Sequence, residues 1–261
     1  MKAFNPKTKI QFMKITFIGH SSLLLETAGA RLVTDPHFNS RMLWLSRERP
    51  PGVNIESLTD VDGILVSHGH LDHLDPRTLR RFGEGATLAV PPGLGWIGRR
   101  CVNGRTTVLR PWETIGIGSA SITAVPVNHV NFRPGFIFGR GTGYLIEVNG
   151  LTLFFAGDTS YFDGFGAIGG RREIDVAFLP IGPLRPEWFQ RRFHMNPDQA
   201  LLALKELGAR MMVPIHWGAF RYMFDGARDA VRRFVNSARK MGLKNRIVVL
   251  EPGESAIFSR S

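Results

Sequence analysis

The sequence predicts a single domain of the α/β class, on three observations. Short apolar segments separated by turn residues fill its first half, strand-like and helix-like segments alternate in its second half, and 43% of its 261 residues are hydrophobic. A chain of this length and composition can bury one large core, and its length suits one domain better than two small ones. We therefore expect one domain over residues 1–261.

The first third of the chain is expected to form a β-meander. Its apolar segments are short and are broken by glycine or by Asp35-Pro36; they cover residues 15–17, 23–25 and 32–33. A further buried strand is expected at 64–66. Asp75 followed by Pro76 matches an N-cap with proline at the first helical position, so a helix is expected from Pro76 to about Phe82.

The rest of the chain alternates between strands and helices. Helices are expected at 197–207, with Asn196 as the N-cap, and at 227–241. Asn149-Gly150 predicts a tight turn between two antiparallel strands. The remaining strands are expected at 87–90, 106–109, 121–127, 144–148, 151–155, 176–179, 211–215 and 247–250.

Composition narrows the kinds of protein that this chain can be. No apolar run reaches the roughly 18 residues of a membrane span, and none follows the first lysines to form a signal peptide. Cys101 is the only cysteine, so an internal disulfide is excluded and a metal site must use nitrogen and oxygen ligands. We expect a cytoplasmic protein.

The formal net charge of the chain is +11. A charge of this size favours an anionic small molecule, nucleic acid or an anionic membrane surface, without choosing among them. The arginines occur in pairs along the chain rather than in one block, which is typical of a solvated basic surface. Peripheral contact with an anionic membrane is one expectation, and the oligomeric state is left open.

The segment Ser67-His68-Gly69-His70-Leu71-Asp72-His73 places three histidines and a carboxylate directly after an expected buried strand. Such strand ends commonly carry active sites in α/β folds. Residues two apart in an extended segment point the same way, so His68 and His70 can bind one metal ion. Asp72 and His73, after the chain turns, can reach a second. Imidazole and carboxylate suit zinc, with iron and manganese as alternatives.

A hydrolytic pair of metal ions needs about three further ligands, one of them a bridging carboxylate. Three residues that follow expected strands can supply them: Asp158, as the bridge, His129 and His216. A lone residue at such a position is more often a turn residue. The order of all these residues along one chain favours a metal centre.

These motifs, in this order, resemble the metallo-β-lactamase superfamily over about residues 13–255, which implies a four-layer αββα sandwich. The matching segments are Gly19-His20-Ser21-Ser22, Thr34-Asp35-Pro36, the segment from Ser67 to His73, His129, Gly157-Asp158-Thr159 and Ile215-His216-Trp217-Gly218. Three more segments resemble the branch of N-acyl-phosphatidylethanolamine-hydrolysing phospholipase D and the ascorbate-phosphate lactonases: 178–182, 194–197 and 209–210.

The resemblance implies a role for each matching residue. It assigns one divalent ion, expected to be Zn²⁺ with Mn²⁺ or Fe²⁺ as alternatives, to His68, His70 and His129. It assigns the second ion to Asp72, His73 and His216, with Asp158 as the bridge.

Other residues are implied to support this centre. Asp35 is expected to steady the metal-bound imidazoles, and His194 to line the substrate pocket. His20 lies at a strand end near the site, where a structural turn residue is equally consistent. The candidate catalytic residues are Asp72, Asp158 and His194.

The expected mechanism is hydrolysis by a hydroxide that bridges the two ions and attacks a phosphoryl or carbonyl centre. His194, titrating near neutral pH, or a water on the second metal ion would protonate the leaving group. A phosphate could be held by nearby arginines, Arg185, Arg191 and Arg192. Two sets of aromatic residues fit a substrate-contacting wall and core packing equally well: Phe132, Phe136 and Phe138, and Trp188, Phe189 and Phe193.

Three activities are compatible with such a centre. A phosphodiesterase, phospholipase D-like and acting on a small or phospholipid-like phosphodiester, agrees best with the resemblance and the positive charge. A lactonase or another carboxylic-ester or amide hydrolase is the alternative. A nuclease is less favoured, because no added arm or domain is present to grip a long nucleic acid.

Overall fold

The computed structural model describes residues 12–43, 45–102, 104–133, 136–221, 225–226 and 228–260. The side chains of Phe132, Phe136 and Phe138 lie outside this description. Both interpretations of them, a substrate-contacting wall and core packing, stay predictions. None of the helices in the described ranges combines the length and the apolar run that a membrane span needs.

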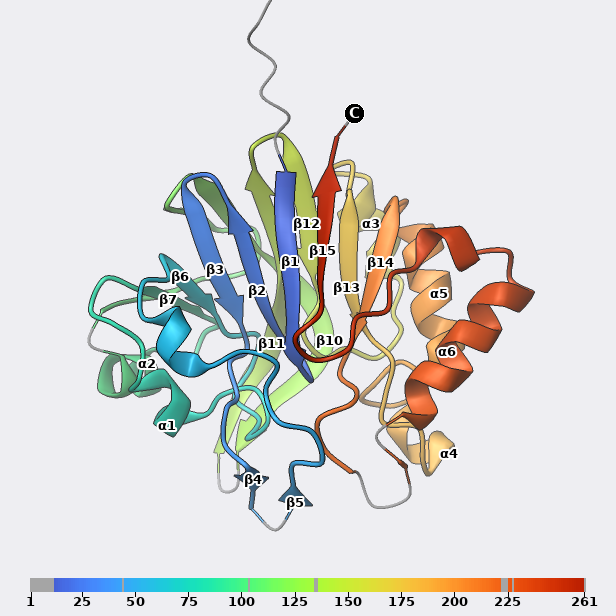
Figure 1. Cartoon of the computed structure of the whole chain (residues 1–261), viewed down its shortest axis with the longest axis horizontal. Helices are drawn as coiled ribbons and strands as arrows, with labels where there is room; N and C mark the ends of the chain where they lie inside the picture. The colour runs from blue at the N-terminus through green and yellow to red at the C-terminus, as the bar shows by residue number, and fades with distance from the viewer. Residues whose placement is uncertain are drawn as a thin grey trace, which may run out of the picture.

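Two large sheets pack face to face at the centre of the molecule (Figure 1). The first sheet has the order β15-β1-β2-β3-β6-β7-β8. Its strands are β1 (Phe12–Gly19), β2 (Ser22–Thr27), β3 (Ala30–Thr34), β6 (Gly63–Leu65), β7 (Thr87–Val90), β8 (Arg105–Val108) and β15 (Ser255–Ser259). The first three form the expected antiparallel meander, and β3, β6, β7 and β8 are parallel to one another.

The second sheet has the order β14-β13-β12-β11-β10-β9. Its strands are β9 (Thr114–Ile117), β10 (Ala120–Arg133), β11 (Phe136–Val148), β12 (Leu151–Phe155), β13 (Val176–Pro180) and β14 (Met211–Ile215). The last three are parallel, and the others pair antiparallel. Asn149 and Gly150 join β11 to β12 with φ angles of 50° and 73°, which confirms the predicted hairpin turn.

Helices cover the two outer faces, so the layers follow the order αββα that the resemblance implies (Figure 1). On the side of β6 and β7 lie α1 (Pro76–Leu79) and α2 (Gly95–Cys101); on the side of β13 and β14 lie α3 (Gly164–Gly169), α5 (Pro197–Glu206) and α6 (Asp229–Lys240). Short elements complete the fold: the two-stranded β4 (Arg41–Met42) and β5 (Leu45–Ser46), α4 (Glu187–Gln190), and 3-10 turns at Ile55–Leu58 and Lys244–Arg246.

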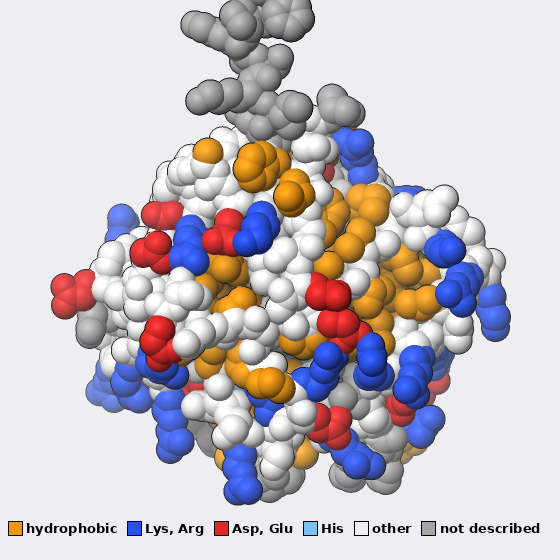
Figure 2. All heavy atoms as spheres, viewed as in Figure 1, with side chains coloured by type: hydrophobic (Ala, Val, Ile, Leu, Met, Phe, Trp, Pro, Cys, Tyr) orange, Lys and Arg blue, Asp and Glu red, His pale blue; other side chains and the backbone are white. Residues whose placement is uncertain are grey.

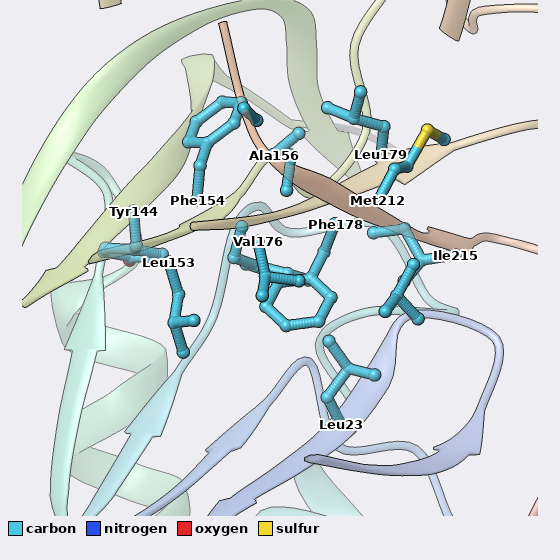
Figure 3. Close-up of a cluster of buried hydrophobic side chains, with 14 of the residues drawn as sticks. Leu23, Tyr144, Leu153, Phe154, Ala156, Val176, Phe178, Leu179, Met212 and Ile215 are labelled. Carbon is cyan, nitrogen blue, oxygen red and sulfur yellow. The ribbon is translucent and has the colours of Figure 1, made fainter. Parts of the chain in front are cut away.

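The main core lies between the sheets. Figure 3 shows Leu23 of β2 facing Phe178 of β13 and Ile215 of β14, and all three side chains are fully buried. Tyr144 of β11 crosses between the sheets and donates its hydroxyl hydrogen bond to the carbonyl of Val66, 2.8 Å away. This bond fixes the end of the strand that leads into the His68 segment.

Both predicted helix caps are present. Asp75 accepts hydrogen bonds from the backbone of Arg77 and Thr78, and Asn196 forms a reciprocal capping box with Gln199. Helix α5 ends within one residue of the prediction, whereas α1 ends at Leu79 rather than near Phe82.

Three further sequence expectations differ from the structure. Residues 247–250 do not form a strand; Ile247 makes only an isolated bridge to Met212, so their apolar character reflects packing against the core. Helix α6 begins at Asp229, and Ala227, where the helix was expected to start, lies outside the described residues. β10 extends to Arg133, so His129 lies within a strand rather than after one.

Candidate metal centre

Loops from both sheets meet at one edge of the sandwich. β1 runs toward the edge where β4, β5 and α4 lie (Figure 1). All seven predicted metal-binding residues come together there. His68, His70, Asp72 and His73 follow β6, His129 lies in β10, Asp158 follows β12, and His216 follows β14.

Three imidazoles form the first group. His70 Nδ1 lies 2.9 Å from His68 Nε2 and 3.2 Å from His129 Nε2. Tetrahedral coordination at a metal–nitrogen distance of about 2.0–2.1 Å separates neighbouring nitrogens by about 3.3 Å, close to these spacings. Nitrogen atoms that converge in this way repel one another unless a proton or a cation lies among them. Together with Asp158 they can hold a metal ion.

The second group contains Asp72, His73 and His216. Asp72 Oδ2 lies 3.5 Å from His216 Nε2 and 3.7 Å from His73 Nε2. His20 joins them, with its Nε2 only 3.0 Å from the same oxygen. The four ligand atoms lie within 4.8 Å of one another, close enough to surround a single ion.

Asp158 lies between the two groups. Its Oδ2 is 3.1 Å from His216 Nε2 and 3.2 Å from His73 Nε2 on one side, and 3.8 Å from His68 Nε2 and 3.9 Å from His129 Nε2 on the other. Within the described part of the chain, neither carboxylate oxygen makes a well-formed hydrogen bond, although the side chain is buried. A buried carboxylate in this state fits a cation ligand.

Asp35 organises the residues behind the first segment. Its Oδ1 accepts the backbone hydrogen bond of Ser67 at 2.7 Å, and its Oδ2 accepts from the Ser67 hydroxyl at 2.6 Å and from His73 Nδ1 at 2.7 Å. The Ser67 hydroxyl is also 2.9 Å from His68 Nδ1. Because the Nδ1 atoms of His68 and His73 are engaged, their Nε2 atoms are directed into the centre.

The backbone of two glycines holds the site loops in place, and at Gly157 close approach requires glycine. Gly157 has φ +59°, and a Cβ atom there would lie 2.3 Å from Ser67 Cβ, so the chain just before Asp158 can pass the His68 segment only as glycine. Gly69 donates its backbone hydrogen bond to Asn131 Oδ1 at 2.7 Å, which holds the loop between His68 and His70 against β10.

Burial and mutual charge set the ionisation of these groups. Burial opposes ionisation of Asp158, but His216, His73 and His194 hold its pKa well below the usual range. Burial lowers the pKa of His68 far below its usual value, and the neighbouring histidines lower it further. Burial acts in the same direction at His73 and His216, but Asp158 and the other nearby carboxylates outweigh it, raising the pKa of His73 well above its usual value and that of His216 to about 9. The carboxylates and His68 thus have the forms that bind metal ions, whereas binding at His73 and His216 would release protons.

His194 reaches the centre from the loop between β13 and α5, residues 181–196, which contains α4 and is called the α4 loop below. Its Nδ1 lies 3.5 Å from Asp158 Oδ2, and its ring stacks near His216 with centroids 5.1 Å apart. Its side chain is 14% exposed, against 1% for Asp158. Burial lowers the pKa of His194 well below its usual value, although Asp158 acts in the opposite direction. Burial therefore acts against the expectation that His194 titrates near neutral pH, and that expectation stays a prediction.

The α4 loop carries exposed aromatic and basic side chains. Trp188 is 70% exposed and Phe189 42%, which excludes core packing for both, whereas Phe193 is half-buried. The carbonyl of Phe193 accepts a hydrogen bond from His129 Nδ1 at 2.9 Å, so the loop also orients a residue of the centre. The three arginines near His194, Arg185, Arg191 and Arg192, are all exposed.

Lysines and arginines are spread over the face shown in Figure 2 and are interspersed with acidic side chains. On this face they do not gather into one block, in agreement with their distribution along the sequence.

Sequence reasoning left His20 without a role. In the structure the ring centroids of His20 and His216 lie 4.1 Å apart. Only 1% of His20 is exposed. Burial, followed by the charge of His216, lowers the pKa of His20 to about 3. The signal in the sequence was its position directly after the Gly19 that ends β1, the same arrangement that identified His216 after β14.

The chain matches known proteins along most of its length. The family model described as beta-lactamase superfamily domain matches residues 30–217. N-acyl-phosphatidylethanolamine-hydrolyzing phospholipase D 1 of Caenorhabditis elegans is 32% identical over 226 residues; the match covers 78% of this chain but only 64% of the phospholipase, so the chain spans about two thirds of that relative's length. A UPF0173 metal-dependent hydrolase of Geobacillus sp. (strain WCH70) is 32% identical over 252 residues, covering 93% of this chain and 98% of the relative.

A solved structure agrees in fold. A metallo hydrolase of the hyperthermophilic archaeon Ignicoccus hospitalis KIN4/I has a TM-score of 0.74 at 24% identity, covering 96% of this chain and 100% of the other. The fold and the cluster of histidines and aspartates are like those expected of the metal-dependent hydrolases that the chain resembles. The chain belongs to the metallo-β-lactamase superfamily.

Proposed function

We propose that this chain is a dinuclear hydrolase that cleaves a small or phospholipid-like phosphodiester. The observation that carries the proposal is the position of Asp158, whose Oδ2 lies within 4 Å of ring nitrogens from both groups of histidines. A single carboxylate between two sets of imidazoles suits two cations better than one.

In this proposal each group of residues holds one ion, His68, His70 and His129 the first, and Asp72, His73 and His216 the second, with Asp158 shared. Two divalent cations, Zn²⁺ by the donor set with Mn²⁺ or Fe²⁺ as alternatives, would supply Lewis acidity and lower the pKa of bound water. Asp72 and Asp158 contribute the negative charge that retains the cations. The ring orientations imposed by Asp35 and Ser67 keep the nitrogens aimed at them.

His194 is proposed to contact the substrate. Its side chain lies beside Asp158 and is partly exposed, so its ring can donate one N–H hydrogen bond to a substrate oxygen or exchange a proton with the substrate. It lies on the same loop as α4, which also carries the exposed arginine and aromatic side chains.

An anionic, lipid-like substrate is supported by the chemistry of the α4 loop. Trp188 and Phe189 expose apolar area beside Arg185, Arg191 and Arg192, a combination suited to an acyl chain next to a phosphate or to the surface of an anionic membrane. Sedimentation with vesicles of phosphatidylcholine, with and without phosphatidylglycerol, tests the membrane contact. Binding to the anionic vesicles that is lost in the Trp188→Ala/Phe189→Ala variant is expected.

The proposed activity is tested by turnover of a substrate panel with metal-reconstituted protein. The panel contains bis(p-nitrophenyl) phosphate, a neutral lactone and a phosphatidylethanolamine derivative, with the Asp158→Ala variant as the background control. We expect the two phosphodiesters to be hydrolysed fastest. Turnover of the lactone alone would replace the phosphodiesterase proposal with a lactonase, or another carboxylic-ester or amide hydrolase, built on the same centre.

A further inference from the structure

His20 occupies a strained backbone position at the end of β1. Its φ is +62°, in the left-handed region that few residues other than glycine and asparagine adopt readily. Its carbonyl accepts a hydrogen bond from the backbone N–H of His216 at 2.9 Å, and His20 forms an isolated antiparallel β-bridge with Trp217. The same residue therefore joins the end of β1 to the segment that carries His216.

The side chain of His20 makes a second connection within the same group. Asp72 Oδ2 faces three imidazole nitrogens, and His20 Nε2 is the nearest at 3.0 Å, against 3.5 Å for His216 and 3.7 Å for His73. A carboxylate only accepts hydrogen bonds, so the proton in this contact is on His20 Nε2. The His20 ring also packs on that of His216 with centroids 4.1 Å apart.

We propose that His20 is a positioning residue for the second metal ion. The Nε2–H of His20 fixes the rotation of the Asp72 carboxylate, and its ring limits the rotation of His216. It does not itself bind the ion. The inference rests on the proposed dinuclear function, since it concerns the ion held by Asp72, His73 and His216.

His37 is a matched control for this role. It is as buried as His20, at 2% against 1%, and its ring meets Phe220 edge-on at 5.2 Å, much as the His20 ring does at 5.4 Å. Its Nδ1, however, lies 3.2 Å from Arg47 Nη2, and His37 belongs to none of the metal-binding groups found among the described residues. Replacing it removes a buried imidazole next to the site without touching Asp72.

The test removes zinc from the full chain in steps, by adding a chelator at increasing concentration. Two variants separate the hydrogen bond of the His20 side chain from the left-handed backbone at this position. Asparagine tolerates the left-handed backbone but is too short to reach Asp72, whereas the amide nitrogen of glutamine can take the place of Nε2 as a donor. We expect His20→Asn to release one of its two ions about 10- to 100-fold more readily than wild type, with the other ion retained. His20→Gln should recover most of this loss, and His37→Asn should match wild type.

Cobalt substitution separates positioning from direct binding. The absorption spectrum of the Co²⁺-loaded protein should be nearly the same in wild type and His20→Gln, because the ligands are unchanged. The inference is overturned if His20→Asn retains both ions like wild type. It is also overturned if His20→Gln behaves like His20→Asn and has an altered cobalt spectrum, which would make His20 a ligand. A single ion in wild type would instead contradict the proposed dinuclear function itself.

Discussion

His73 Nδ1 and Asp35 Oδ2 lie 2.7 Å apart, and neither side chain has any exposed surface. The same carboxylate accepts two hydrogen bonds from Ser67, so one aspartate aligns both ends of the His68 segment. The prediction is that Asp35→Asn, of nearly equal volume, weakens metal binding by about 10- to 100-fold, because its amide group cannot accept all three hydrogen bonds.

Metal affinity of Asp35→Asn is measured by competition with a chelator. Asp62→Asn is the control, since Asp62 accepts a backbone hydrogen bond from Arg31 at 2.7 Å just before the other end of β6. Equal affinities in wild type and Asp35→Asn would show that the imidazole orientations do not depend on Asp35.

His194→Ala separates substrate contact from metal binding. We expect its metal content to match wild type and its turnover to fall by about 10- to 10,000-fold, the range for loss of a substrate contact or proton acceptor. Metal analysis and steady-state kinetics on the same preparation measure both. Loss of an ion from this variant would make His194 a ligand, a role that its 3.5 Å approach to Asp158 allows geometrically.

Gly157→Ala tests the close passage of two site loops. A Cβ atom at Gly157 would overlap Ser67 Cβ at 2.3 Å, so we expect a loss of about 2 to 5 kcal/mol in the free energy of unfolding of the metal-free protein. Gly208→Ala is the matched control, with φ +62° and no atom of the described residues within 4 Å of the added Cβ. It should lose only about 1 kcal/mol, from backbone strain alone. Similar urea midpoints for the two variants would contradict the packing argument.

The arginines of the α4 loop are tested by salt and by substitution. If Arg191 and Arg192 attract an anionic substrate, kcat/KM for a phosphodiester falls as salt rises, because screening shortens their reach to about 8 Å at physiological ionic strength. The Arg191→Gln/Arg192→Gln variant should raise KM for the phosphodiester and leave a neutral ester nearly unchanged.

The control for this pair removes the same charge from another face. Arg99 and Arg100 lie on α2, on the opposite flank of the molecule from α4 (Figure 1). Substituting them by Gln should leave KM unchanged. Salt-independent kinetics in wild type, with an unaltered KM in the α4 variant, would mean that these arginines are only a solvated surface.

The sequence predicts most of the fold because its signals are local. Alternating apolar residues identified β1, and proline after a capping residue marked the starts of α1 and α5. Residues 247–250 were wrongly predicted to form a strand, because an apolar run gives the same signal whether it pairs with a strand or only packs on one. The position of His129 within β10 was missed because a register shift between Pro126 and Val130 interrupts the strand there, and such irregularities depend on the partner strand.

The candidate centre was predicted less completely than the fold. Six of the seven residues were found because they follow strands, in motifs that the sequence shows, and His129 was found from its place in their order along the chain; the structure brings all seven together. The contact of His20 with Asp72 joins residues 52 positions apart and depends on a left-handed backbone at His20. No local pattern encodes such a contact. The low pKa of His194 likewise arises from burial among groups that meet only in the folded chain.

The number of metal ions per chain tests the central claim most directly. After zinc reconstitution and removal of free metal, elemental analysis of wild type should give close to two ions per chain. Asp158→Ala should lower both the metal content and the activity, because it removes a ligand shared by both ions and leaves their repulsion unscreened. A wild-type protein that retains at most a trace of metal, or an Asp158→Ala variant with undiminished metal content and activity, would contradict the proposed centre.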